Sequence, residues 1–410
     1  MTSWKTIHIS DLGRIVTGKT PKTSVKANYG GDIPFLTPSD DLTGKYVPKT
    51  NKSITEVGLS EVKNCLLQAN AICVSCIGSD LGKVVKTTKP LVTNQQINSI
   101  IPYEDYDADF IYYLMLIVGG QLNYLSKTST AVPIINKTQF SNFEVKVPSL
   151  EEQRRIAGIL GAIDDKIENN RRINDNLEQQ AQAIYKQWFV DFEFPNEEGK
   201  PYKSSGGKMV DSELGPIPDG WSVIGYGDAV DIKGGGTPPT NNPEFWNGSI
   251  PFFTPKDVSS DCFAIHTEKS ITEAGLSNCN SKLYAKDTVF ITARGTVGKV
   301  VMAGCSMAMN QTNYALIGKN ELSQYFVYLL TIALVDRLLK KANGAVFNAI
   351  TTRDFEGEQI VHPTNFVLGK FIDIISPLYQ QVLSIAKENE ILATLRDTLL
   401  PKLMNGEIKL

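Results

Sequence analysis

The sequence repeats itself at one fixed distance, and this repeat constrains the fold more than any other feature. Four separate segments recur at an offset of 217 residues without a gap. These matches are Trp4 with Trp221, Thr20-Pro21 with Thr237-Pro238, 33–40 with 250–257, and 53–60 with 270–277. Agreement of this length indicates that the chain contains two copies of one module.

Downstream of these segments the two copies continue to match with small insertions. The later matches are 78–84 with 295–300, Asn94-Gln95 with Asn310-Gln311, and Phe140 and Pro148 with Phe355 and Pro363. Within each module, short apolar runs bounded by turn residues predict buried strands, at 71–74 and at 288–291. One internal helix is predicted at 109–122, with its counterpart at 322–339.

Each module is followed by a segment with the spacing of a long packed helix. Apolar residues alternate at intervals of four and three, which is typical of a coiled-coil seam. The seam positions are Ile156, Leu160, Ile163, Ile167, Leu177, Ala181, Ile184 and Trp188, then Phe371, Ile375, Leu378, Val382, Ile385, Leu392, Leu399 and Leu403. Asn170 and Asn174 interrupt the first seam and Asn389 the second. We predict that the two helices pair, that these asparagines fix their register, and that Pro377 kinks the second helix.

The segments divide the chain into five parts. A polar stretch rich in Gly, Pro and Ser separates the first helix from the second module and predicts an exposed linker. The predicted parts are a first module at 1–149, a central long helix at 150–194, a linker at 195–215, a second module at 216–364 and a C-terminal long helix at 365–410.

Charge is low and unevenly distributed. The formal net charge is −3; residues 1–150 carry 15 basic and 12 acidic side chains, whereas residues 211–364 carry 12 and 16. Dedicated DNA-binding domains often have a pI above ~9, so a DNA-binding role for this chain requires phosphate neutralisation from elsewhere. No apolar run reaches the ~18 residues of a membrane span, and no signal-peptide core is present, which together predict a cytoplasmic protein.

No motif of the sequence predicts catalysis or metal binding. Cys73 and Cys76 form a C-x-x-C, but a second pair or histidines at ligand spacing are absent, so we expect reduced, partly buried thiols. Gly78 to Lys83 is too short for a phosphate-binding loop, and nucleophile-elbow and H-E-x-x-H motifs are absent. The acidic pair Asp191 and Glu193 lacks the following lysine of a nuclease site. The sequence therefore favours a non-catalytic binding protein.

The helical segments carry the motifs that identify a family. These motifs are LEEQRRIA at 150–157, AIDDKI at 162–167, NRRIN at 170–174, WFVDF at 188–192 and LRDTLLPKLMNGEI at 395–408. Over essentially its whole length the chain resembles the specificity (S) subunits of type I restriction–modification systems. The twin I-P-F-x-T-P-x-D segments and the loop at Arg294 resemble the target-recognition domains of that family.

The resemblance implies an α+β fold with two pseudo-twofold-related target-recognition domains, separated by two long antiparallel paired helices that resemble a coiled coil. Each domain would read one half of an asymmetric, bipartite double-stranded DNA target. A helix of ~40 residues is ~60 Å long at ~1.5 Å per residue. At ~3.4 Å per base pair, the half-site centres would then lie at most ~17 base pairs apart.

The family also implies partners. Two modification (methyltransferase) subunits, and through them restriction/translocase subunits, would hold S-adenosylmethionine, ATP and Mg²⁺, with no cofactor on this chain. Two other functions remain open: a two-armed protein–protein scaffold, and the specificity subunit of a methylation-only anti-phage system.

Polar side chains in the loops shared by both modules are the candidate DNA contacts. Arg294 suits a guanine, and the amide side chains Asn94, Gln95, Gln96, Asn310 and Gln311 suit an adenine. Lys19, Lys83, Lys233 and Lys299 suit phosphates. The remaining candidates are Thr20, Thr37, Ser39, Thr237, Thr254, Lys256 and Thr296. Module 1 has Ile77 in place of Arg294, which argues against both halves reading the same base there.

Local structural roles are the alternative for all of these loop residues, because Asn and Gln often satisfy nearby backbone and Thr-Pro often marks a turn. On the helical segments, the candidates for docking the modification subunits are Glu152, Arg155, Asp164, Arg396 and Leu403. Helix packing is the alternative for these five.

Overall fold

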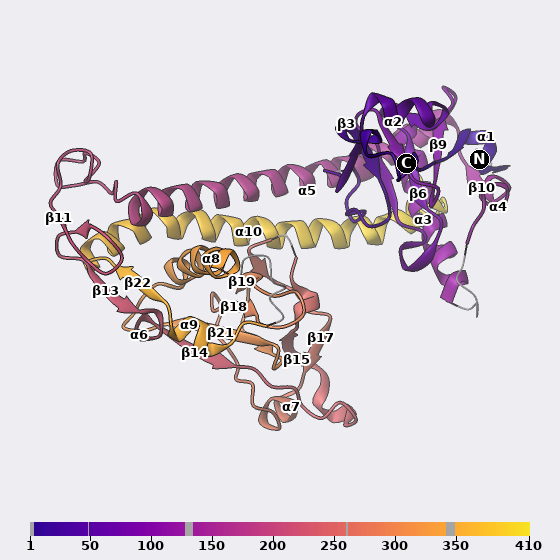
Figure 1. Ribbon diagram of the computed structural model, residues 1–410. Coiled ribbons are helices and arrows are strands. Elements are labelled where there is room, and N and C mark those ends of the chain that lie inside the picture. The colour runs from indigo at the N-terminus through magenta and orange to yellow at the C-terminus, as the bar shows by residue number, and fades with distance from the viewer. Residues whose placement is uncertain (1–3, 48, 128–133, 260, 342–348) are drawn as a thin grey trace. The chain divides into compact units, whose positions relative to one another are not determined.

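The computed structural model describes residues 4–47, 49–127, 134–259, 261–341 and 349–410 (Figure 1). The chain divides into two compact units: unit 1 is Met1–Ile167 with Ile391–Leu410, and unit 2 is Glu168–Glu390. Two long helices, α5 (Leu150–Tyr185) and α10 (Asn365–Met404), contribute residues to both units. The compact units therefore divide the chain within these helices, whereas the predicted parts were bounded at the helix starts.

Unit 1 is built on two four-stranded sheets within its described residues. The first, antiparallel throughout, has the order β2 (Gly13–Thr17), β9 (Ile97–Pro102), β6 (Ile72–Ser75), β7 (Val84–Lys86). The second has the order β4 (Lys52–Ile54), β3 (Tyr29–Leu36), β8 (Leu91–Thr93), β5 (Leu66–Leu67), with β3 and β8 parallel. A ribbon of β1 (Lys5–His8) and β10 (Glu144–Val147) completes it, and α3 (Ala108–Lys127) packs on β6 and β7.

Unit 2 repeats this topology, as the sequence repeat predicts. Its larger sheet has the order β14 (Val230–Gly234), β21 (Asn313–Gly318), β18 (Val289–Thr292), β19 (Val300–Ala303), β16 (Phe263–Ala264). The smaller has β17 (Lys269–Ile271), β15 (Trp246–Phe253), β20 (Ala308–Met309), and the ribbon pairs β13 (Ser222–Gly225) with β22 (Gln359–His362). Helix α8 (Gln324–Lys341) covers the larger sheet as α3 does in unit 1 (Figure 1).

The remaining elements are short. They are α1 (Ile9–Leu12), α2 (Glu56–Glu61) and α4 (Lys137–Ser141) in unit 1, and α6 (Tyr226–Ala229), α7 (Glu273–Ser277), α9 (Thr352–Glu356), β11 (Met209–Val210) and β12 (Ile217–Pro218) in unit 2. The predicted strands at 71–74 and 288–291 are confirmed as β6 and β18, and the predicted internal helices as α3 and α8, with ends displaced by a few residues at most.

A glycine inside α3 is explained by a close backbone approach. A Cβ atom on Gly119 would lie 2.0 Å from the carbonyl oxygen of Gly82, and one on Gly82 would lie 2.1 Å from that of Gly119. Gly82 also has a φ of +89°, which favours glycine. The two glycines therefore let α3 lie directly against the loop that follows β6.

The predicted pairing of α5 with α10 is confirmed inside each unit, and the pairing is antiparallel. In unit 1, Ile156 and Leu160 share a core with Leu400, Leu403 and Met404. In unit 2, the Asn170 amide donates to Asn389 Oδ1 (2.8 Å), and the Asn174 amide donates to the Val382 carbonyl (3.2 Å). Asn170 and Asn174 are both buried, so the asparagines occupy the seam as predicted.

Two details of α10 differ from the predictions. Tyr379 is fully buried, whereas Leu378 and Ile385 are half-buried, because the Tyr379 ring stacks on Tyr325 at 5.2 Å and takes the seam position. The helix also continues without interruption through Pro377. Pro377 lies on the exposed side of α10, where water can satisfy the carbonyl that the proline leaves unpaired.

The cysteines of the C-x-x-C are buried thiols beside polar neighbours. The Ser99 hydroxyl lies 3.4 Å from Cys73 Sγ, and the Asn98 amide lies 3.2 Å from Cys76 Sγ. Burial raises the pKa of the Cys73 thiol to about 12. Among the described residues, no group of three or more His, Cys, Asp or Glu side chains is placed to hold a metal ion. None of the described helices has the length and apolarity needed to cross a bilayer.

Candidate nucleic-acid interface

Four loops of unit 1 converge on one edge of its two sheets. The turn at 94–96 joins them through backbone hydrogen bonds: the Asn94 amide donates to the Leu36 carbonyl (3.0 Å), and the Cys76 amide donates to the Gln96 carbonyl (2.9 Å). The Lys19 amide donates to the Thr93 carbonyl (2.9 Å), which brings in the end of β2. We call this surface edge 1 and define it as residues 17–20, 37–40, 76–83 and 94–96.

Unit 2 contains the same convergence, made by the corresponding backbone groups. The Asn310 amide donates to the Phe253 carbonyl (3.0 Å), the Ala293 amide to the Thr312 carbonyl (2.9 Å), and the Gly236 amide to the Met309 carbonyl (3.0 Å). Edge 2 is defined as residues 233–237, 254–257, 293–299 and 310–312. All the loop residues that the sequence selects as DNA contacts lie on edge 1 or edge 2, so the fold brings together segments far apart in the chain.

One side-chain pair is repeated on both edges. The Thr20 hydroxyl donates to Gln95 Oε1 (2.7 Å), and the Thr237 hydroxyl donates to Gln311 Oε1. Both glutamines are exposed. Because the hydroxyl engages the amide oxygen, it fixes which way each amide faces, and Oε1 keeps a second lone pair for another donor.

Four candidates have local structural roles in the turns. The hydroxyls of Thr37 and Thr254 donate to the carboxylates of Asp40 (3.1 Å) and Asp257 (2.7 Å) within tight turns. The Asn94 amide donates to Gln96 Oε1 (2.8 Å), and Asn310 Oδ1 accepts from the Thr312 hydroxyl (2.7 Å). These side chains hold the loops, whereas Ser39, Lys256 and Thr296 lie exposed on them.

The basic candidates divide by their neighbours. Lys83 forms an ion pair with Asp80 (2.6 Å), and Lys233 lies 3.5 Å from Asp231. Lys19, Lys299 and Arg294 are exposed. Two lysine charges are thus partly compensated inside the chain, which leaves the second group better suited to an external anion.

The loops after β6 and β18 share a backbone frame although their lengths differ. Gly78 and Gly295 have φ angles of +77° and +81°, and Gly82 and Gly298 have +89° and +83°. Ile77 forms an isolated bridge with Ile134, and Arg294 forms the equivalent bridge with Ala349. Edge 1 therefore presents a half-buried aliphatic side chain at the place where edge 2 presents an exposed guanidinium.

Three of the five docking candidates lie inside unit 1. Asp164 has a side-chain exposure of 5% and accepts from the Tyr113 hydroxyl (2.5 Å) and from Arg396 (2.9 Å). Leu403 is 1% exposed within the core. These contacts match the helix-packing alternative. Glu152 remains half-buried, and Arg155 is exposed, pairing with Glu151 and donating to the Leu410 carbonyl (3.3 Å).

A buried charged cluster beside α5 has no signal in the sequence. Lys45 and Lys86, with side-chain exposures of 5% and 8%, both contact the Asp109 carboxylate at 2.8 Å. Burial by itself would raise the pKa of Asp109, but the hydrogen bonds and charges of the two lysines outweigh it and lower that pKa. The Tyr113 ring lies 5.3 Å from the Lys45 ammonium, which links the cluster to Asp164.

Two copies of one module, each with a polar loop edge held by the same backbone bonds and each joined to the paired helices, define a duplicated binding protein. The chain matches the family model described as the type I restriction modification DNA specificity domain, over residues 1–179 and 218–393. The chain therefore belongs to the family of type I restriction–modification DNA specificity proteins. The family predicted from the helical motifs is confirmed, and the chain is a DNA-recognition subunit.

Relatives agree over the full length. The chain is 30% identical to the MjaIX specificity subunit of Methanocaldococcus jannaschii over 415 residues, covering 99% of this chain and 94% of the relative. It is 24% identical to the HindI specificity subunit of Haemophilus influenzae over 473 residues, covering both chains completely. The crystal structure of a type I S subunit from M. genitalium shares the fold, with a TM-score of 0.55 at 17% identity over 98% of this chain and 96% of that one.

Proposed function

We propose that this subunit reads an asymmetric, bipartite DNA target, with edge 1 contacting one half-site and edge 2 the other. The observation that carries the proposal is the repeated edge itself. The same backbone bonds hold both edges, while the exposed side chains differ, most clearly at Ile77 and Arg294. A shared frame with different reading groups suits two half-sites that occupy equivalent positions but differ in sequence.

The repeated Thr–Gln pairs support a shared element in the two half-sites. A glutamine recognises adenine when Oε1 accepts from N6 and Nε2 donates to N7. The threonine hydroxyls on Gln95 and Gln311 orient each amide for this contact and leave one lone pair of Oε1 for N6. We infer that each half-site contains an adenine facing its glutamine, and that Arg294 adds a guanine contact in one half-site.

The charge balance supports assembly with partner subunits. A chain with a net charge of −3, whose second module is acidic, cannot supply much phosphate neutralisation. We infer that two modification subunits supply further phosphate contacts and carry S-adenosylmethionine, with ATP and Mg²⁺ on the restriction/translocase subunits. This chain would select the site, and its partners would carry out the chemistry.

Methylome mapping tests the proposal. The chain is expressed with its modification subunit, and methylated adenines are mapped across a genome by long-read sequencing. We expect a split, asymmetric motif. Arg294→Ala should relax one position in one half-site, at a cost of about 1–3 kcal/mol in discrimination. Gln95→Ala and Gln311→Ala should each relax only their own half-site, while Thr20→Ser, which keeps the hydroxyl, should preserve the motif.

Two results would contradict this assignment. A contiguous or palindromic motif would mean that the edges do not read separate half-sites. A uniform loss of methylation at all sequences with Arg294→Ala would identify a phosphate contact instead, and the salt dependence of binding would then become shallower by about one ion.

A further inference from the structure

The two equivalent tryptophans of the repeat have different surroundings. In unit 2, Trp221 is 7% exposed because the chain's own segment after α5 covers it. Phe194 stacks on its indole with ring centroids 5.1 Å apart, and Phe192 meets it edge-on at 5.7 Å. Tyr202 then stacks on Phe194 at 4.5 Å. An extended Phe-Glu-Phe segment thus occupies the surface around Trp221.

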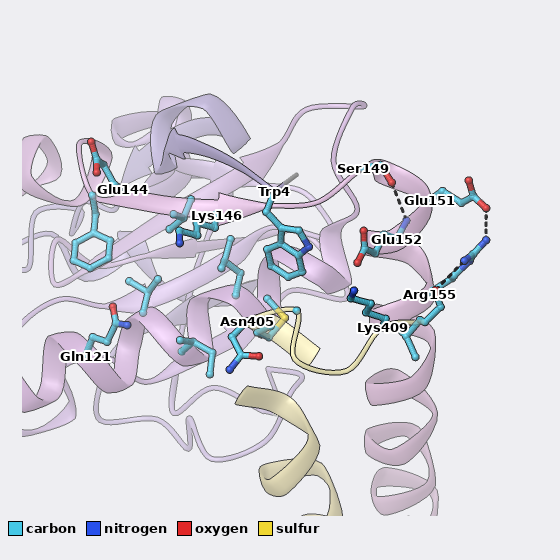
Figure 2. A pocket seen from close by; sticks show the side chains of 18 residues that line it. Trp4, Gln121, Glu144, Lys146, Ser149, Glu151, Glu152, Arg155, Asn405 and Lys409 are labelled. Carbon is cyan, nitrogen blue, oxygen red and sulfur yellow. Dashed lines mark hydrogen bonds and ion pairs between the residues drawn. The ribbon is translucent and has the colours of Figure 1, made fainter. Parts of the chain in front are cut away.

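In unit 1, Trp4 lines a groove with a volume of about 870 Å³ (Figure 2). Leu114, Ile117 and Val118 of α3 line it together with Phe143. Figure 2 shows the indole in the middle of the groove, with Glu152 and Lys409 on one side and Gln121 on the other. Among the residues that the structure describes, Phe110 is the aromatic partner of Trp4, edge-on at 6.4 Å. No described ring stacks on the indole as Phe194 stacks on Trp221.

The groove is itself part of the repeat. Its α3 residue Ile117 and its β10 residue Val145 correspond to Ala333 of α8 and Ile360 of β22, which line a pocket of about 970 Å³ in unit 2. In unit 2 that pocket is also lined by Phe192, from the covering segment. The molecule therefore shows, in unit 2, a ligand of the chemistry that the unit 1 groove fits.

We propose that the unit 1 groove binds an extended aromatic–x–aromatic segment of a modification subunit. The partner's identity rests on the proposed function; the ligand chemistry does not. Alternate residues of an extended segment point to the same side, so two rings separated by one residue can reach both Trp4 and the apolar α3 face. The rim carries charges of both signs, including Lys146, Glu152 and Lys409, so the aromatic contacts would determine recognition.

A peptide assay with the intact chain tests the ligand chemistry. The probe is a labelled peptide with the sequence of residues 190–203, and its control replaces both phenylalanines by alanine. We expect binding by fluorescence anisotropy only with the aromatic probe, together with a change in tryptophan emission that Trp4→Phe removes. Ile117→Arg on half-buried Ile117 should weaken binding about tenfold or more, since it places a charge in the apolar contact. The matched variant Ala333→Arg in unit 2 should leave binding to unit 1 unchanged.

Assembly with the modification subunit tests the occupant. By analytical ultracentrifugation, Ile117→Arg should weaken the binding of one of the two modification subunits, and excess aromatic peptide should do the same to the wild-type chain. A photo-cross-linker at Gln121 should capture the modification subunit. Capture of a second copy of this chain, full assembly with Ile117→Arg, or equal binding of both peptides would overturn the proposal. If the proposed function fails instead, the wild-type complex assembles without sequence-specific methylation, and the peptide results stand independently.

Discussion

The pair formed by Asp164 and Arg396 separates a docking role from a packing role. Asp164 is 5% exposed and Arg396 24% exposed at the side chain, and the hydroxyl of fully buried Tyr113 donates to the same carboxylate. Removing one member of a buried pair costs about 3–5 kcal/mol. Asp164→Asn keeps an acceptor for Tyr113, and Arg396 keeps its contact with Asp397 at 2.8 Å, so we expect a smaller loss of about 2–3 kcal/mol.

Hydrogen exchange measured by mass spectrometry suits this test, because a chain with two compact units need not unfold in one step. Asp164→Asn should reduce amide protection in unit 1 around 156–167 and leave unit 2 unchanged. Asp165→Asn is the matched control, since Asp165 is exposed and accepts only a 3.2 Å hydrogen bond from Tyr46. Unchanged protection in Asp164→Asn together with lost affinity for the modification subunit would refute the packing interpretation.

A further variant tests the electrostatic part of this reasoning. Replacing the whole network by apolar groups, with Asp164→Leu, Arg396→Met and Tyr113→Phe together, leaves no buried polar group unpaired. Such replacements are often neutral or stabilising. We therefore expect the triple variant to regain most of the protection that Asp164→Asn loses. A triple variant that is less stable than Asp164→Asn would mean that the ion pair itself stabilises unit 1.

Three more predictions concern single contacts. Asn170→Leu should cost about 1–2 kcal/mol because Asn389 loses its donor, and adding Asn389→Leu should restore stability in urea titrations. Burial raises the pKa of Glu178, so its stabilising effect is present below its ordinary pKa and is lost as pH rises through the raised value; Glu178→Gln should flatten this part of the stability–pH curve. Gly82→Ala should lower the melting temperature, by the loss of at least about 1–2 kcal/mol, whereas Gly120→Ala, with open space at its Cβ, should raise it slightly.

The fold followed from the sequence wherever a pattern was local or repeated. The fixed offset of 217 residues predicted two modules, and the seam spacing predicted the helix pair with Asn170 and Asn174 inside it. Strand partners could not be predicted in this way. The parallel pairing of β3 with β8 joins segments more than 50 residues apart. It depends on packing between sheets, which no local pattern encodes.

The candidate site was predicted unevenly for a related reason. The loop residues were found because both modules keep them, and the fold places them all on edges 1 and 2. Asp164 was assigned to the surface because acidic residues are seldom buried. Its spacing, four residues after Leu160 and three before Ile167, already placed it on the seam. The Lys45 and Lys86 cluster had no such signal, since two buried lysines on one carboxylate run against the average behaviour of lysine.

The way the edges are held explains how one module can serve two different half-sites. The three bonds that join the loops of each edge are made by backbone groups, such as Asn94 to Leu36 in one and Asn310 to Phe253 in the other. Backbone bonds do not depend on which side chain a position carries, and the left-handed glycines at the loop ends preserve the path of the chain. An exposed residue such as Arg294 can therefore change without disturbing the frame. Variation of base specificity at constant fold is the property that a DNA-reading module needs, and in this chain the frame and the reading groups are carried by different atoms.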